Sequence, residues 1–199
     1  MKKIFHYKTA FAFIFLAIAA IANFKTGSWI ENHYPNEQIS PDLLLNNLPY
    51  VPIFNIISEL SLFAGLVLLA FLASTSLKLR LPYFVTNLAT VYAARAILIT
   101  LTPLAQTSPL KDQPNFYGVT YSGMFPSGHI ALATIIFLLV RRYGSNLLAT
   151  QVSAVLVVLQ GVSLLLSHGH YSIDLIGGMM LAYVTYRWLL RFERQLSIG

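Results

Sequence analysis

Apolar residues occur in six long runs along the chain, and polar residues gather between these runs. The runs lie at about residues 9–23, 53–73, 82–101, 127–141, 146–166 and 170–190. Most of them approach the roughly 20 residues that an α-helix needs to cross a bilayer. We therefore expect an all-α membrane helix bundle with six transmembrane helices, formed by a single domain over residues 1–199.

Composition supports this membrane assignment. Hydrophobic residues make up 56% of the chain and charged residues only 10%, whereas a soluble domain has about 25% charged residues. The chain has no cysteine, which excludes a disulfide framework, a thiolate nucleophile and a zinc–thiolate site.

Basic residues predict the orientation of the bundle. Ten of the thirteen Lys and Arg residues fall on one side of the membrane if the runs alternate in direction, and the positive-inside rule then places both termini in the cytoplasm. They are Lys2, Lys3, Lys8, Lys78, Arg80, Arg141, Arg142, Arg187, Arg191 and Arg194. The net charge of +6 is therefore mostly topological, and we expect membrane lipids as partners, with no nucleic acid and no obligate protein partner.

The first 22 residues also resemble a cleavable signal peptide, because Met1-Lys2-Lys3 precedes an apolar run that ends in small residues. We expect this segment to be retained, since an even number of helices agrees with basic residues at both ends of the chain. The short basic start and the small size suit a bacterial inner membrane.

Two polar segments should lie on the outer side. For Thr26–Pro52 we expect an ordinary surface loop, with a re-entrant or interfacial segment over the active face as the alternative. The second, Thr102–Met124, contains several prolines and leads directly into the first polar motif.

That motif is Pro126-Ser127-Gly128-His129, at the outer start of the fourth helix. Proline and a small hydroxyl residue suit a helix start, and glycine would let a ligand approach the backbone. The unpaired amides and the dipole of a helix start attract an anion. The motif therefore predicts a phosphate site.

A second group of titratable residues falls on the same side. His170 and Asp174 are four residues apart, so a helix places them on one face, where the carboxylate can fix the imidazole tautomer. Arg95, inside the third run, needs an anionic partner. Lys111, in the second outer loop, is a further candidate for binding phosphate, and His168 and Tyr171 are candidates for contacting a lipid headgroup.

Two other interpretations stay open. Glu59 forms a polar patch with Asn55 and Ser58 near the outer end of the second helix; it would contact a headgroup or bond between helices. His129, His170 and Asp174 could instead bind zinc. We expect no metal, because there is no second carboxylate nearby and a zinc site would not explain the phosphate-binding helix start.

The two motifs resemble those of the type 2 phosphatidic acid phosphatase (PAP2) superfamily, over about residues 88–190. There are departures: Leu88 stands where the superfamily's first motif has lysine, Ala96 follows Arg95 where that motif has Arg-Pro, and Ser163-Leu164 replaces a Ser-Arg pair. The remaining pattern is more similar to the sphingomyelin synthase branch. That similarity rests on Arg95 followed by the segment 100–104, and on the stretch from His168 to Asp174. Gly123 replaces an aspartate of the synthases.

The resemblance implies a lipid phosphoesterase that acts at the extracytoplasmic face on a phospholipid or lipid phosphate. His170 would attack phosphorus and form a phosphohistidine, with Asp174 orienting its ring, and His129 would protonate the leaving oxygen and then activate the acceptor. Arg95 and the amides around Ser127 and Gly128 would stabilise the phosphoryl oxygens, and no cofactor is implied.

Three functions follow from this pattern, and we favour the first. The enzyme would hydrolyse its lipid substrate. The alternative is a headgroup phosphotransferase, similar to sphingomyelin synthase, that passes the phospho-headgroup to a lipid alcohol. A transporter or channel without enzymatic activity is the third; the absence of obvious inverted repeats and the polar residues at one face argue against it.

Overall fold

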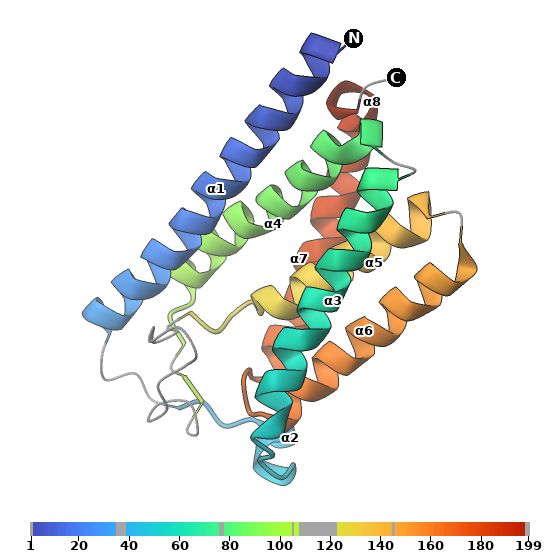
Figure 1. Cartoon of the computed structure of the whole chain (residues 1–199). Coiled ribbons are helices and arrows are strands. Elements are labelled where there is room, and N and C mark those ends of the chain that lie inside the picture. The colour runs from blue at the N-terminus through green and yellow to red at the C-terminus, as the bar shows by residue number, and fades with distance from the viewer. Residues whose placement is uncertain are drawn as a thin grey trace.

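Helices form the whole of the described structure, apart from short turns and connections. The computed structural model describes residues 2–34, 39–75, 78–104, 106–107, 123–144 and 146–197. The helices are α1 (Lys2–His33), α2 (Leu43–Asn47), α3 (Ile53–Thr75), α4 (Leu81–Leu101), α5 (Gly128–Tyr143), α6 (Leu147–Leu166), α7 (Ser172–Leu189) and α8 (Glu193–Leu196). Figure 1 shows the long helices as a bundle, and the all-α prediction is confirmed.

Each of the six apolar runs is helical, but the described helices differ in their suitability to cross a bilayer. By length and composition, α1, α3, α4 and α6 are candidate membrane spans. With 16 residues, α5 extends over about 24 Å at 1.5 Å per residue. It packs against α3, α4, α6 and α7. The shortest of the six is therefore at the centre of the bundle.

The first long helix extends well beyond the run that predicted it. The expected helix ended near residue 23, and α1 ends at His33. It packs along α4, and Ile30, in its last turns, is fully buried. The expectation of a loop beginning at Thr26 is therefore wrong, because packing against α4 continues past the polar residues that interrupt the apolar run.

The chain from residue 39 to residue 51, here called the outer segment, lies against the connection between α6 and α7. The Val51 amide donates to the Leu166 carbonyl at 2.8 Å, and the Ser40 amide donates to the Tyr171 hydroxyl at 3.3 Å. An ordinary surface loop does not describe this part of the chain. Most of the second outer loop, at residues 105 and 108–122, lies outside the described residues.

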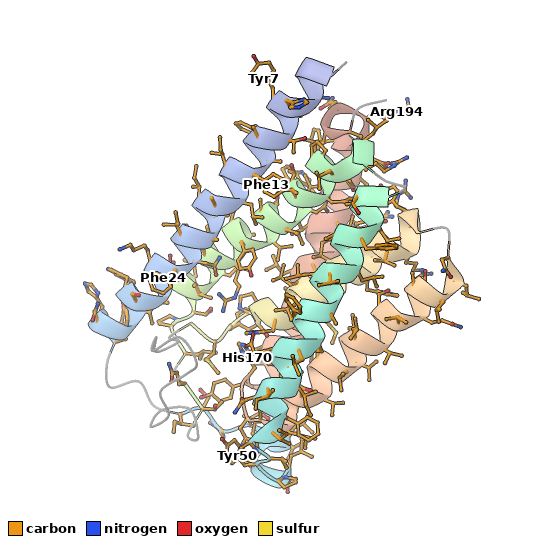
Figure 2. The ribbon with its side chains drawn as sticks, in the orientation of Figure 1. Tyr7, Phe13, Phe24, Tyr50, His170 and Arg194 are labelled. Carbon is orange, nitrogen blue, oxygen red and sulfur yellow. The ribbon has the colours of Figure 1, made fainter. Side chains whose placement is uncertain are left out.

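The opposite end of the bundle carries the basic residues. Glu193 pairs with Arg80, and with Arg142 at 3.3 Å. The Lys8 ammonium donates to the carbonyls of Gln195 at 2.6 Å and of Ser197 at 3.0 Å. Figure 2 shows Tyr7 and Arg194 at this end and His170 and Tyr50 toward the other. The start of α1 and the end of α8 therefore lie together, as an even number of crossings requires.

A buried polar cluster joins α3 to α6. The Gln160 amide donates to the Ser58 hydroxyl at 2.5 Å, and the Ser61 hydroxyl donates to the Gln160 carbonyl oxygen at 2.5 Å. Gln160 is fully buried. Because a lipid environment offers these groups no water, such bonds hold helices together. The cluster fixes α3 on both sides of Glu59 along the chain, at Ser58 and Ser61.

Candidate active site

The start of α5 and the start of α7 meet at the end of the bundle away from the basic residues. The Ser127 amide, just before α5, donates to the backbone carbonyl of Asp174 at 3.0 Å. Gly178 permits this approach: a Cβ atom there would lie 2.5 Å from the Ser127 carbonyl oxygen. A glycine and one hydrogen bond thus bring the two polar motifs together.

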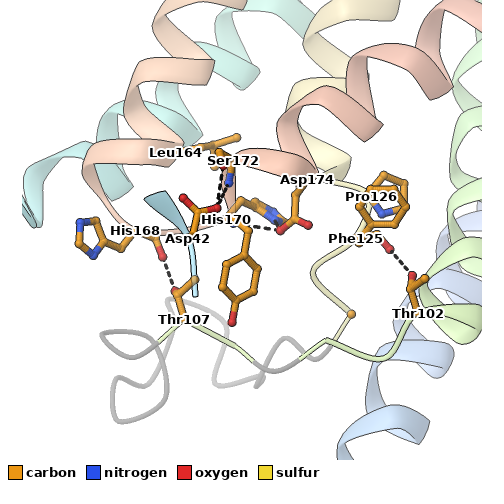
Figure 3. Close-up of polar contacts among 12 residues, drawn as sticks. Asp42, Thr102, Thr107, Phe125, Pro126, Leu164, His168, His170, Ser172 and Asp174 are labelled. Atoms are coloured by element: carbon orange, nitrogen blue, oxygen red, sulfur yellow. Dashed lines mark hydrogen bonds and ion pairs between the residues drawn. The ribbon is translucent and has the colours of Figure 1, made fainter. Parts of the chain in front are cut away.

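The predicted pairing of His170 with Asp174 is present. The His170 Nδ1 and the Asp174 Oδ2 are 3.1 Å apart, and the same oxygen accepts the Tyr171 amide at 3.0 Å. Figure 3 shows both side chains at the start of α7. Asp174 is fully buried. A carboxylate on Nδ1 leaves Nε2 as the nitrogen able to attack a substrate.

The two histidines of the motifs face each other. The ring centres of His129 and His170 are 6.3 Å apart, with the rings inclined at 61°. The arrangement therefore fits a single phosphoryl group handled by two imidazoles.

Glu59 contacts His129. Its Oε1 lies 3.0 Å from the Nε2 of His129, across from α3 to α5. The Glu59 side chain is 54% exposed and that of His129 is 32% exposed. This contact is a bond between helices, which was one of the two interpretations of Glu59, and it allows Glu59 to orient the histidine and support its charged form.

Arg95 reaches the start of α5 from α4. Its Nε donates to the Pro126 carbonyl at 2.8 Å and its Nη2 donates to the Gly123 carbonyl at 2.9 Å, while its Nη1 donates to the Asn23 side chain. The guanidinium therefore holds the chain that leads into α5. Sequence reasoning missed Asn23, although a polar amide inside an apolar run was a usable signal.

The position of Gly123 explains one departure from the synthases. Its φ is +99°, a conformation that glycine adopts readily and other residues rarely do. A Cβ atom there would also lie 3.1 Å from the Ile99 Cβ. An aspartate does not fit this backbone, whose carbonyl is one of the acceptors for Arg95.

Ser127 and Gly128 occupy the expected helix start. Ser127 precedes the first residue of α5 and is fully buried, and its hydroxyl has no partner among the described residues. The first amides of α5 follow Ser127 directly along the chain. They are groups suited to bind an anion.

The remaining candidates lie elsewhere. The His168 Nε2 is 3.1 Å from the Leu48 carbonyl, and its own carbonyl accepts a bond from Thr107. Tyr171 is buried and packs with Leu45. Both side chains therefore contact the outer segment. Lys111 lies outside the described residues.

The described residues contain no group of three or more His, Asp or Glu side chains arranged to hold a metal ion. The arrangement of His129, His170 and Asp174 thus differs from that of a zinc site. The chemistry available from these side chains is nucleophilic attack and proton transfer.

A comparison with known families adds an independent observation. A family model described as AtPDCT1/2 matches residues 53–189. PDCT denotes phosphatidylcholine:diacylglycerol cholinephosphotransferase, a sphingomyelin synthase-like enzyme of the PAP2 superfamily. The matched range includes every candidate site residue named from the sequence. No curated protein matches the chain.

Proposed function

Since the chain belongs to the AtPDCT1/2 family of PAP2-like phosphotransferases, we propose that it moves phosphocholine from a phosphatidylcholine to a diacylglycerol within the membrane. This is the transferase alternative, in place of the hydrolase that the sequence favoured. A transporter or channel has no support in this family. The observation in the structure that supports the proposal best is the pair of facing imidazoles, 6.3 Å apart.

In the first half of the reaction, the Nε2 of His170 attacks the phosphorus of the donor lipid. The bond between phosphorus and the glycerol oxygen breaks, and His129 donates a proton to that oxygen, which releases diacylglycerol. Phosphocholine is then bound to His170. Asp174, 3.1 Å from Nδ1, keeps the proton on that nitrogen and stabilises the charge that develops on the ring.

In the second half, a different diacylglycerol occupies the place of the first. His129 accepts the proton of its hydroxyl, and the oxygen attacks phosphorus and breaks the bond to His170. A new phosphatidylcholine leaves and His170 is free again. Glu59, 3.0 Å from His129, supports the protonated imidazole that is present before the first half and again after the second.

The charge on the transferring group needs stabilisation throughout. The amides that begin α5, the buried hydroxyl of Ser127 and the guanidinium of Arg95 form the set of donors for this purpose. His168 and Tyr171 contact the outer segment and are left out of this set, and Lys111, outside the described residues, stays a prediction.

We further propose that α5 and α7 cross the membrane with the four candidate spans, which gives six crossings. The basic residues at one end of the bundle support cytoplasmic termini, and the site would then face the extracytoplasmic side. The chain is a multi-pass membrane protein; a bacterial inner membrane has no support, because the matching family is from plants.

The test is a transfer assay in vesicles. Purified protein is reconstituted with phosphatidylcholine radiolabelled in its phosphate and with a diacylglycerol of different acyl composition. We expect the label to appear in phosphatidylcholine that carries the new acyl chains. Labelled phosphocholine in the water phase, without labelled new lipid, would identify a hydrolase and contradict the proposal.

Variants test the assigned roles. His170→Ala should abolish transfer, and His129→Ala should reduce it by about 10²–10⁴-fold. His33→Ala is the matched control, because His33 lies on exposed α1 surface and stacks on Trp29. Full activity in His170→Ala would exclude the phosphohistidine.

A further inference from the structure

A single carboxylate of the outer segment is bonded to two helix starts. The Oδ1 of Asp42 accepts the amides of Leu44 at 3.0 Å and of Leu45 at 3.1 Å, which caps α2. Its Oδ2 accepts both the amide and the hydroxyl of Ser172, each at 2.7 Å. Asp42 is only 8% exposed. All four bonds therefore lie in a protected place, where a carboxylate acceptor is strong.

The pKa of Asp42 agrees with this bonding. Burial raises it, but the bonds from Ser172 and from the amides of Leu44 and Leu45 outweigh burial and leave the pKa below its ordinary value. Asp42 is therefore ionised at neutral pH.

The bonds to Ser172 fasten the chain immediately after His170. Ser172 is the first residue of α7. The Tyr171 amide is held by Asp174 and the next amide, that of Ser172, by Asp42. Two carboxylates, one from inside α7 and one from the outer segment, thus hold two consecutive amides next to the nucleophile. Negative charge also suits this end of the helix dipole.

Other hydrogen bonds between the outer segment and this turn involve no carboxylate. The Ser40 amide donates to the Tyr171 hydroxyl at 3.3 Å, and the His168 Nε2 is 3.1 Å from the Leu48 carbonyl. Bonds to an ionised group are roughly twice as strong as neutral ones. Figure 3 shows Asp42 and Ser172 beside the His170–Asp174 pair. Asp42 is thus the strongest attachment of the outer segment at this place.

We propose that Asp42 is a positioning residue for His170: by holding the start of α7 it sets the place of His170 relative to His129. The inference rests on the proposed function, in which His170 is the nucleophile. Asp42 precedes the residues 53–189 that the family model matches, so the contact belongs to this chain outside that match.

The experiment measures kcat and apparent KM of transfer in vesicles, together with thermal unfolding. Asp42→Ala should lower kcat by about 10–100-fold, since a displacement near 1 Å at a reacting group has that effect. Apparent KM for both lipids should stay within about two-fold, since Asp42 acts through α7 and not on the substrate. Trapping of labelled phosphohistidine should slow in parallel with kcat.

Two further variants separate positioning from general stability. Asp42→Asn has one acceptor oxygen, which can serve α2 or Ser172 but not both, so its kcat should fall between those of wild type and Asp42→Ala. Asn146→Ala removes the cap of α6 at the end remote from the site, where the Asn146 side chain accepts the Leu148 amide at 2.8 Å. It should lower the unfolding temperature and leave kcat unchanged.

A double-mutant cycle identifies the path. If Asp42 acts through Ser172, adding Ser172→Ala to Asp42→Ala should cost almost no further activity, although Ser172→Ala alone lowers kcat. Independent, multiplicative effects would overturn the inference. So would wild-type kcat in Asp42→Ala, or an equal loss in Asn146→Ala. Should Asp42→Ala fail to fold, Asp42→Asn with Ser172→Ala makes the same comparison.

Failure of the proposed function would be visible separately. If wild type releases phosphocholine to water, transfer is wrong, yet the same variants can be compared by the rate of that release. If wild type transfers phosphocholine and Asp42→Ala keeps its kcat, only the positioning role is wrong.

Discussion

Replacing Gly178 with alanine should separate the two halves of the site. The new Cβ would lie 2.5 Å from the Ser127 carbonyl oxygen and 2.5 Å from the Ile130 Cγ2. Neither atom can give way by itself. The Ile130 Cγ2 is attached to the Cβ of a fully buried β-branched residue, whose χ1 is restricted in a helix, and the Ser127 carbonyl accepts the Ala131 amide at 3.2 Å inside α5. The start of α5 must therefore move away from α7.

The size of this movement follows from the contact distance. Ordinary van der Waals contact of a Cβ begins near 3.4 Å, so α5 must retreat by about 0.9 Å, and overpacking of this kind costs about 1–3 kcal/mol. The retreat also stretches the 3.0 Å bond from Ser127 to Asp174. Because His129 moves with α5, the rate should fall by about 10²-fold.

The assay compares transfer rate and unfolding temperature in Gly178→Ala and Gly65→Ala. At Gly65, in α3, the nearest atom to an added Cβ is the Ile136 Cδ1 at 3.6 Å, which is ordinary contact. There alanine should be neutral, or stabilising by about 0.5–1 kcal/mol through helix propensity. A Gly178→Ala protein with the activity and unfolding temperature of Gly65→Ala would refute the close approach of α5 and α7.

Three further outcomes can be measured. The pKa of Asp42 is lowered in the folded protein, so ionised Asp42 stabilises the fold fully above its ordinary pKa of about 3.9, and this stabilisation is lost as pH falls through the pKa of the folded state. Below the folded-state pKa, wild type and Asp42→Asn should therefore have the same unfolding temperature. A difference between them that grew toward acid would contradict this direction. Gln160→Leu removes the bonds to two serines of α3 and should lower stability by about 1 kcal/mol, measured by thermal unfolding; an unchanged unfolding temperature would count against that cluster. Glu59→Gln should lower the transfer rate by about 10-fold or more, because the amide cannot balance the charge of protonated His129; an unaltered pH–rate profile would exclude this role.

Local patterns in the sequence were sufficient to predict the long helices and the contact between one pair of site residues. Apolar runs are an internal property of each segment, so all six could be located. Likewise, His170 and Asp174 are four residues apart, and helix geometry alone brings them together. The short helix α2 was not anticipated, and the clearest misplacement among the long helices is the end of α1 at His33. There, packing against α4 decided the boundary.

The contacts that complete the site join residues far apart in the chain. Glu59 and His129 are 70 residues apart, and Asp42 and Ser172 are 130 residues apart. No periodicity relates such positions, because helix packing and the path of the outer segment bring them together. The N-cap at Asp42 was detectable from an acidic residue before three leucines. The hydrogen bonds from Ser172 to the same carboxylate were not detectable from the sequence.

The sequence identified Arg95 as a site residue but predicted only part of its role. A guanidinium inside an apolar run predicted an anionic partner, and the structure gives it the carbonyls of Gly123 and Pro126 and the amide of Asn23. These three acceptors are neutral oxygens, so the bonds fix the guanidinium without cancelling its charge. The same residue can therefore hold the start of α5 and still act on a phosphoryl group. Gly128 was expected to admit a ligand; a Cβ there would lie 3.0 Å from the Arg95 Nε, so the glycine first of all makes room for the arginine.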